Sequence, residues 1–234
     1  MKIINKFKNK LLWRKRVRRL ILNLSIYYLR KNNKLPEKTK LVYEYFLAHN
    51  DSEHIISELD AAIIYNLVLK YKPKNCIDLG SGLGTSCAMV AHAMDENGFG
   101  HVQSFEQLEW MANEASRIID EKKITRASIQ QAECVVEKYF GEDFACYQYE
   151  YKDQVDMVIV DGPFALSKIK EPKSHYEKIL PNGDLFKLLP FLTKGAIVFV
   201  DARLSSVDAY RKYLGRDFIF AQNRVGYTLM IYKG

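Results

Sequence analysis

Segments typical of strands alternate with segments typical of helices from residue 57 onward, and this alternation limits the possible folds most. The expected strands are residues 75–79, 102–106, 127–131, 155–161, 196–201, 218–222 and 227–232. Helices are expected over 57–71, from 85, over 109–121, briefly after 131, and over 185–192 and 207–214. Such alternation needs crossover connections, which place helices on both faces of a mostly parallel sheet. The sequence therefore predicts an α/β fold with a doubly wound sheet of seven strands.

Details of individual segments refine this expectation. Residues 157–160 (Met-Val-Ile-Val) form a near-continuous apolar run, as in a parallel strand buried on both faces. The short link 223–226 makes the last two strands an antiparallel pair. Ser57-Glu-Leu-Asp60 resembles a capping box at the start of the first of these helices. We expect a Rossmann-like, mostly parallel sheet with an antiparallel last strand.

The first 40 residues differ sharply in charge from the rest. They carry 14 Lys or Arg and one acidic residue, a balance of +13, whereas residues 41–234 have a balance of −6. Apolar residues in the segment follow a helical spacing, with Pro36 beyond its end. They are Trp13, Val17, Leu20, Leu24 and Tyr28. The pattern predicts a basic amphipathic helical arm over 1–40, attached to a domain over 41–234.

The arm has three interpretations that the sequence leaves open. In the first, the arm lies on an anionic membrane surface; in the second, it binds nucleic acid through phosphate contacts. In the third, its apolar stripe packs on the domain or on a second subunit of a homodimer. The sequence contains no run of about 18 uncharged apolar residues, so it predicts no membrane-spanning helix. The four cysteines form no C-x-x-C pair and the sequence has no secretory signature, which favours a cytoplasmic protein with reduced thiols. In the first interpretation of the arm, this protein would be peripheral at a membrane surface.

A glycine-rich turn follows the first expected strand. It reads Asp78-Leu-Gly-Ser-Gly-Leu-Gly84, with Thr85 opening the next helix. Ligands of parallel sheets bind beyond the carboxyl ends of the strands, and glycines let a ligand approach bare backbone. The spacing departs from the G-x-G-x-x-G dinucleotide fingerprint, and the acid before it suits a cationic amino acid moiety. The candidate ligand contacts here are Asp78, Gly80, Ser81, Gly82, Gly84 and Thr85.

Carboxylates end or adjoin the next four strands as well. Glu106, followed by Gln107, is placed to accept both hydroxyls of a ribose. Glu133 is a candidate partner for an adenine amino group. Asp161 and Asp201 end the fourth and fifth strands. Because these strand ends meet on one edge of the sheet, we expect the carboxylates to gather around one ligand.

These residues resemble the class I S-adenosylmethionine (SAM)-dependent methyltransferases. Residues 78–84 resemble motif I, Glu106 the ribose-binding acid, and Glu133 the acid near adenine, with Ala132 where glycine is frequent. The likeness covers about residues 55–234. Within the class, residues 155–163 and 197–201 look like the small O-methyltransferases related to the catechol type. The resemblance implies SAM as the cofactor and Asp161 among its contacts.

The resemblance also implies a catalytic centre, with two departures from the family pattern. Catechol-type enzymes bind Mg²⁺ through an acid after strand four and a pair after strand five. Asp161 and Asp201 match two of these ligands, but Ala202 stands in the third position. The family's catalytic lysine is replaced by Phe164, leaving Lys168 and His175 as substitutes.

Methyl transfer to an oxygen of a small-molecule, glycan or lipid acceptor is the leading functional prediction. Asp161 and Asp201, or a metal between them, would assist deprotonation of the acceptor, and the loop 162–184 would shape its pocket. An alternative is a nucleic-acid N-methyltransferase, because Asp161-Gly-Pro-Phe164 differs from an Asp-Pro-Pro-Phe signature only at Gly162. A non-catalytic SAM-binding module and a polyamine-synthase-like transferase are further alternatives. The sequence does not identify the acceptor.

Overall fold

The computed structural model describes residues 27–163, 179–224 and 226–234. Seven strands form one sheet in the order β3-β2-β1-β6-β7-β9-β8. β9 is antiparallel to both of its neighbours, and the other pairs are parallel, so the predicted fold is confirmed. The strands are β1 (Asn75–Leu79), β2 (His101–Glu106), β3 (Ala127–Gln131), β6 (Val155–Val160), β7 (Leu192–Asp201), β8 (Phe218–Arg224) and β9 (Tyr227–Tyr232).

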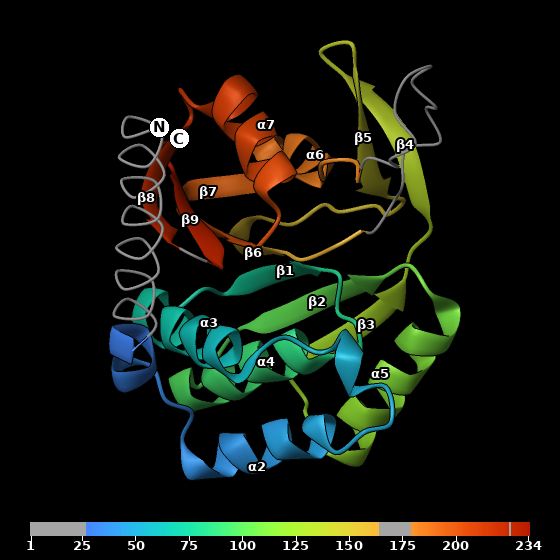
Figure 1. Ribbon diagram of the computed structural model, residues 1–234, viewed down its shortest axis with the longest axis vertical. Coiled ribbons are helices and arrows are strands. Elements are labelled where there is room, and N and C mark those ends of the chain that lie inside the picture. Colours follow the sequence, from blue (N-terminus) through green and yellow to red (C-terminus); the bar gives the residue numbers. More distant parts are fainter. Residues whose placement is uncertain (1–26, 164–178, 225) are drawn as a thin grey trace, which may run out of the picture.

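Helices cover both faces of this sheet (Figure 1). α3 (Glu58–Tyr71), α4 (Thr85–Asn97) and α5 (Glu109–Glu121) lie on one face. α6 (Asp184–Leu188), the 3-10 turn η2 (Leu189–Phe191) and α7 (Leu204–Leu214) lie on the other. α2 (Glu37–Leu47) packs outside α4, and the 3-10 turn η1 (Ser52–His54) leads from it toward α3.

The strict alternation of side chains along the central strands divides the core in two. In β6, Met157 and Ile159 face the α3–α4–α5 layer, whereas Val158 and Val160 face α6 and α7. All four side chains are fully buried. Because both faces of β6 are covered, an uninterrupted apolar run is the pattern that this position in the sheet requires.

The start of α3 follows the predicted capping box. Ser57 Oγ accepts a hydrogen bond from the backbone N–H of Asp60 at 3.2 Å, and it donates to the Asp60 carboxylate. A capping side chain of this kind satisfies a backbone donor that the first helical turn leaves free. The cap also fixes Asp60 on the first turn of α3, at the edge of the sheet where the strands end.

The helix predicted after residue 131 is wrong. β4 (Cys134–Tyr139) and β5 (Glu142–Tyr147) instead form a separate antiparallel hairpin. The two-residue loop Phe140-Gly141 has positive φ at both positions, 54° and 79°, which is typical of tight hairpin turns. β-branched and aromatic residues on both sides of this loop favour strands, and that signal outweighs the helical spacing.

The segment before α3 contains a helix that the sequence did not predict. α2 spans residue 40, where the arm was expected to end, and it buries Tyr43 and Phe46 in the core. Residues 1–26 lie outside the described residues, and residues 27–32 are helical. In this helix Leu29 is buried while Tyr28, the predicted stripe residue, is exposed. Interaction of the arm with a membrane, nucleic acid or second subunit stays a prediction.

Among the helices that the structure describes, none combines the length and the apolar character needed to cross a membrane.

The segment after α2 is tied to α5 through a partly exposed ionic group. His49 Nε2 lies 2.8 Å from Glu114 Oε1, and the Arg117 guanidinium donates to both oxygens of the same carboxylate. These hydrogen bonds, that from Arg117 foremost, lower the pKa of Glu114 to about 2. The segment after α2 is therefore held on α5 partly by the negative charge of Glu114, which is lost when the carboxylate is protonated at low pH.

Replacing Glu114 by Gln is expected to lower the free energy of unfolding by about 1 kcal/mol or less at about pH 7, because exposed ion pairs contribute little. A carboxylate with a depressed folded pKa stabilises the protein above its unfolded pKa of about 4.3 and loses that effect as the pH falls toward the folded value. Urea denaturation of both proteins should therefore show a difference that shrinks from about pH 7 to about pH 3. A difference independent of pH would contradict the ionic origin.

Candidate active site

A cavity of about 740 Å³ lies beyond the carboxyl ends of the central strands, within the size range of small-molecule sites. Four strand ends line it, through residues 80–82 after β1, 106–108 after β2, 161–162 after β6 and 201–203 after β7. Residues 53–57 and Asp60 close it from the side of η1 and α3. The predicted meeting of the strand ends is therefore present for four of the five strands, and the end of β3 is not among the lining residues.

The glycine-rich turn is packed closely against the end of β6. Gly80 has a φ of 102°, and a Cβ on it would lie 2.7 Å from Gly162 Cα. The reverse also holds, because a Cβ on Gly162 would lie 2.7 Å from Gly80 Cα and would meet the hydroxyl of Tyr147. Gly162 is thus required by the packing of this turn, which explains why a second proline does not stand there.

Glu106 joins the turn to the end of β2. Its side chain is 5% exposed, and its two oxygens each accept a backbone N–H, from Gly82 and from Leu108, at 3.0 Å. A carboxylate oxygen has more than one lone pair, so both oxygens keep acceptor capacity toward the cavity. The neighbouring Gln107 and Leu108 also line it.

Ser81 presents the clearest unused polar group of the turn. Its side chain is 4% exposed and lines the cavity, yet its hydroxyl has no hydrogen-bond partner among the described residues. Buried polar groups are nearly always paired in native structures. The unpaired hydroxyl of this cavity-lining residue is therefore a candidate contact for a ligand.

Asp78 supports the turn from behind and does not line the cavity. It is fully buried, and one carboxylate oxygen accepts the hydroxyls of Ser86 and Ser104, each at 2.7 Å. Burial raises its pKa to about 6, although both serine hydrogen bonds act in the opposite direction. Its carboxylate braces β1 against α4 and β2 through this oxygen, whereas the other oxygen has no hydrogen-bond partner among the described residues. The direct ligand contact predicted for Asp78 stays a prediction.

Several other predicted contacts lie away from the cavity lining. Gly84 caps α4 and packs near Ala115 and Ile129, and Thr85 is buried beneath it. Glu133 is exposed at the start of the hairpin. Ligand contacts from these residues stay predictions. Lys168 and His175, with most of the loop expected to shape the acceptor pocket, fall outside the described residues.

Three aspartates from different elements face the cavity: Asp60 from α3, Asp161 after β6 and Asp201 at the end of β7. Burial raises the pKa of Asp161 to about 8, and the charge of Asp201 adds to this effect. Burial, and then the charge of Asp60, raise the pKa of Asp201 to about 6. The pKa of Asp60 is raised by burial as well. Carboxylates with raised pKa values are stronger bases than free ones, so this edge is suited to accepting a proton.

Arg203 places a fixed positive charge among these carboxylates. Its Nη1 donates to the carbonyl of Pro163 at 2.9 Å, and its Nη2 donates to the carbonyl of Asp161. Its Nε lies 3.8 Å from the Asp161 carboxylate as an ion pair. The side chain is 18% exposed and lines the cavity. The guanidinium therefore holds the chain that follows β6 and offsets part of the local negative charge.

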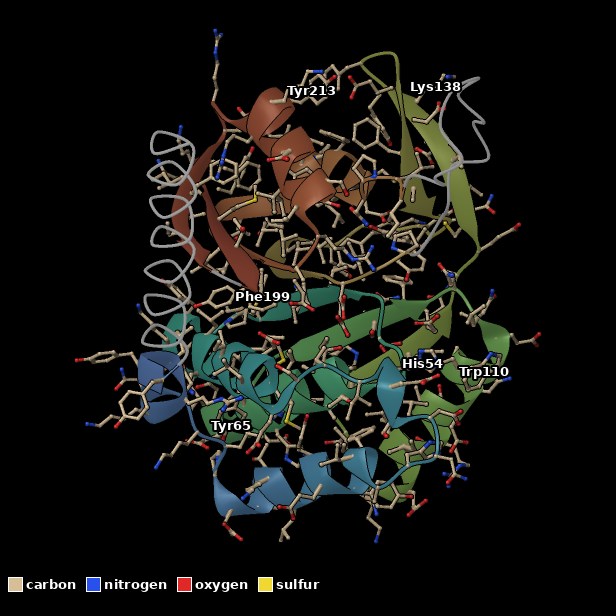
Figure 2. All side chains as sticks on the ribbon, in the orientation of Figure 1. His54, Tyr65, Trp110, Lys138, Phe199 and Tyr213 are labelled. Atoms are coloured by element: carbon tan, nitrogen blue, oxygen red, sulfur yellow. The ribbon has the colours of Figure 1, made fainter. Side chains whose placement is uncertain are left out.

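The η1 turn forms the wall opposite the strand ends. The carbonyl of His54 accepts the N–H of Leu83 at 3.3 Å, which fixes η1 on the glycine-rich turn. The His54 ring meets Trp110 of α5 edge-on, with 6.1 Å between centroids, and the two rings lie together at this rim (Figure 2). Trp110 is half exposed. The rim thus combines aromatic surface with the polar floor of the cavity.

The fold matches solved structures at low sequence identity. A methyltransferase from Podospora anserina, solved with bound SAH, aligns with a TM-score of 0.62 and 13% identity, covering 91% of this chain and 95% of that one. The O-methyltransferase TomG from Streptomyces achromogenes, solved with SAM, aligns with a TM-score of 0.54 and 16% identity, covering 91% and 96%. An O-methyltransferase from Bacillus cereus, also with SAH, reaches 0.52 and 15% identity, covering 85% and 92%.

This chain has the class I methyltransferase fold. No protein-family model matches the sequence, and no curated protein matches it either. The likeness is therefore one of architecture, and it confirms the fold that the resemblance implied. The cavity of the chain lies beyond the strand ends where this fold is expected to hold its ligand.

The methyltransferase fold of the catechol type would place Mg²⁺ between Asp161, Asp201 and residue 202. The donor set here does not fit that ion. Ala202 offers a methyl group, Arg203 brings a positive charge, like that of the metal ion, to the Asp161 carboxylate, and the described residues contain no group of three His, Cys, Asp or Glu side chains arranged to hold a metal. Mg²⁺ requires near-ideal oxygen ligation. No step of the chemistry is therefore assigned to a metal.

A buried polar network beneath the cavity was missed at the sequence level. Asn182 Nδ2 donates to the carbonyl of Gly162 and to Asp184, both at 2.8 Å, while its Oδ1 accepts the hydroxyl of Tyr210 at 2.6 Å. Its backbone N–H donates to Ser206 at 2.9 Å. Burial raises the pKa of Asp184 to about 7 against opposing effects, that of Lys187 first. The network links the end of β6 to α6 and α7.

Replacing Asn182 by Ala is expected to lower the free energy of unfolding by about 1–3 kcal/mol, because the buried Tyr210 hydroxyl and Asp184 carboxylate lose their shared partner. Urea denaturation would measure this loss. Tyr210→Phe is the matched control: it removes one member and leaves the Asn182 amide bonded to Gly162, so it should cost less. Equal stability of the wild type and Asn182→Ala would show that the network does not hold the end of β6.

Proposed function

We propose that this protein transfers a methyl group from SAM to an oxygen of a small acceptor. One observation carries the proposal: Ser81, whose hydroxyl has no partner among the described residues, lines the same cavity as Glu106, Asp161 and Asp201. The first two suit the two ends of SAM, and the aspartates suit the removal of a proton from a hydroxyl. The solved structures with this fold support the choice of cofactor, because they were obtained with SAM or SAH.

The cavity has groups of the right type for SAM. The Ser81 hydroxyl would donate to the carboxylate of its methionine portion, and Glu106 would accept the ribose hydroxyls. Gln107, Leu108 and Met111 would border the adenine. The sulfonium of SAM supplies an electrophilic methyl group, so the protein mainly has to hold the acceptor in line and remove its proton.

The aspartates would perform the proton transfer. Asp161 takes the proton of the acceptor hydroxyl as the oxygen forms its bond to the methyl carbon. The carbon–sulfur bond breaks at the same time, and its electron pair stays on sulfur to give neutral SAH. In its ionised form Asp161 is the stronger base of the two, because burial above all raises its pKa to about 8, compared with about 6 for Asp201; it accepts a proton only where the pH leaves it ionised.

The charge of the cavity favours a neutral or cationic acceptor. Five acidic residues line it, whereas Arg203 is the permanently charged cation among the described lining residues. A polyanion would meet repulsion here, which disfavours the nucleic-acid alternative for the catalytic pocket. The acidic residues are Glu53, Asp60, Glu106, Asp161 and Asp201.

Calorimetry with SAM and with SAH tests the proposal at its first step. We expect saturable binding of one equivalent of each. Absence of binding to the folded protein would overturn the proposal. SAH formation with a panel of phenols, catechols and glycans then tests catalysis. Binding without turnover on any hydroxyl acceptor would favour the non-catalytic module instead.

A further inference from the structure

The Arg203 guanidinium is fixed beside Asp161, one of the two carboxylates that the family resemblance assigns to a metal. Two of its five N–H groups are used by the carbonyls of Asp161 and Pro163. Its buried Nε has no hydrogen-bond partner among the described residues and faces the Asp161 carboxylate across 3.8 Å. Donor capacity therefore remains on a cation that lines the cavity.

The charge of this guanidinium acts on both candidate carboxylates. It opposes the rise in the pKa of Asp161 and also that of Asp201. Residue 202, between Asp201 and Arg203, contributes no oxygen side chain. The centre thus has two carboxylates and one organic cation in place of three oxygen ligands.

We propose that the Arg203 guanidinium takes the place of a divalent cation between Asp161 and Asp201, so that the chain engages its acceptor without a metal. The inference rests on the proposed function, because it assigns a role within the same cavity. A guanidinium donor can pair with the acceptor oxygen as its proton leaves, which is the stabilisation that a Lewis acid would otherwise provide. Its positive charge also repels a divalent ion from the two carboxylates.

Position 202 allows a direct test of this exchange. Ala202 has a φ of 33°, in the left-handed region where Asn is enriched, so Ala202→Asn restores an oxygen ligand in a compatible backbone. Arg203→Gln removes the charge and keeps N–H donors for the carbonyls. Arg203→Met is a second neutral replacement, and Arg203→Lys is the control that keeps the charge.

Binding of Mn²⁺, followed by electron paramagnetic resonance on the full chain with SAH present, is the measurement. The wild type, Ala202→Asn and Arg203→Lys should show no saturable binding up to millimolar Mn²⁺. The double variant Ala202→Asn with Arg203→Gln should bind one Mn²⁺ saturably, with a Kd at least about tenfold below the highest Mn²⁺ concentration at which the wild type shows no binding. If that protein does not fold, the double variant with Arg203→Met replaces it.

Three results would overturn the inference. The first is saturable Mn²⁺ binding by the wild type. The second is binding by Ala202→Asn alone as tight as that of the double variant, because the missing ligand and not the guanidinium would then exclude the metal. The third is no binding by a folded double variant. SAH calorimetry on the same proteins separates these outcomes from failure of the proposed function, which would appear as loss of SAH binding in the wild type.

Discussion

Replacing Asp161 by Asn is expected to lower the rate of methyl transfer by about a hundred- to ten-thousandfold, the usual contribution of a general base. The amide is nearly isosteric with the carboxylate but cannot accept the proton of the acceptor hydroxyl. The two backbone carbonyls that hold Arg203 stay in place, because neither belongs to the side chain. SAH formation with an acceptor found in the panel would measure the rate.

The affinity for SAM separates this effect from damage to the pocket. Calorimetry should give nearly the same SAM affinity for Asp161→Asn and for the wild type, because Ser81 and Glu106 are untouched. Asp120→Asn serves as the matched control, since Asp120 is exposed on α5 and does not line the cavity. An Asp161→Asn protein with wild-type turnover would remove Asp161 from the proton transfer.

Replacing Glu106 by Ala is expected to weaken SAM binding about tenfold or more, because a hydrogen bond to a charged group contributes about 1.5–3 kcal/mol and about 1.4 kcal/mol is a factor of ten. The loss extends beyond the ribose. The backbone N–H groups of Gly82 and Leu108 both lose their acceptor, so the glycine-rich turn is no longer tied to β2. Isothermal calorimetry with SAM measures the effect.

Glu106→Gln distinguishes the two contributions. The amide keeps the volume and one acceptor oxygen, but its NH₂ would face one of the backbone N–H groups. Its SAM affinity should therefore lie between those of the wild type and Glu106→Ala. Melting temperatures of the three proteins show whether the turn alone has loosened. SAM affinity unchanged in Glu106→Ala would exclude this residue from the ribose site.

Local patterns were sufficient for most of the architecture. β1, β3, β9 and α5 have the predicted bounds, because apolar runs and helical spacing depend on burial within one segment. The hairpin β4–β5 escaped prediction although its signal was also local, in the aromatic residues around Phe140-Gly141. α2 escaped because its amphipathic stripe is weak and its first four residues fall in the basic segment 1–40.

The candidate site divides in the same way. Ser81, Glu106, Asp161 and Asp201 were identified because each stands at a strand end, and strand ends can be located from sequence. Asp60 could have been suspected only from its place in the capping box, and Arg203 only from its nearness to Asp201. Tyr147 and Asn182 carry no signal of their own, since their roles depend on contact with Gly162 across the fold.

The sequence by itself determined the seven strands of the main sheet and the helices between most of them, the glycine-rich turn and the row of strand-end acids, because turn chemistry and hydrophobic period act over a few residues. Only the tertiary structure decided which acids share the cavity, which one is enclosed by serines and which cation stands beside them. Those outcomes follow from β1 pairing with β6 and β6 with β7, which brings residues 80, 161 and 203 together although the chain separates them widely. Partners across a sheet are set by the packing of whole layers, and no short pattern records them.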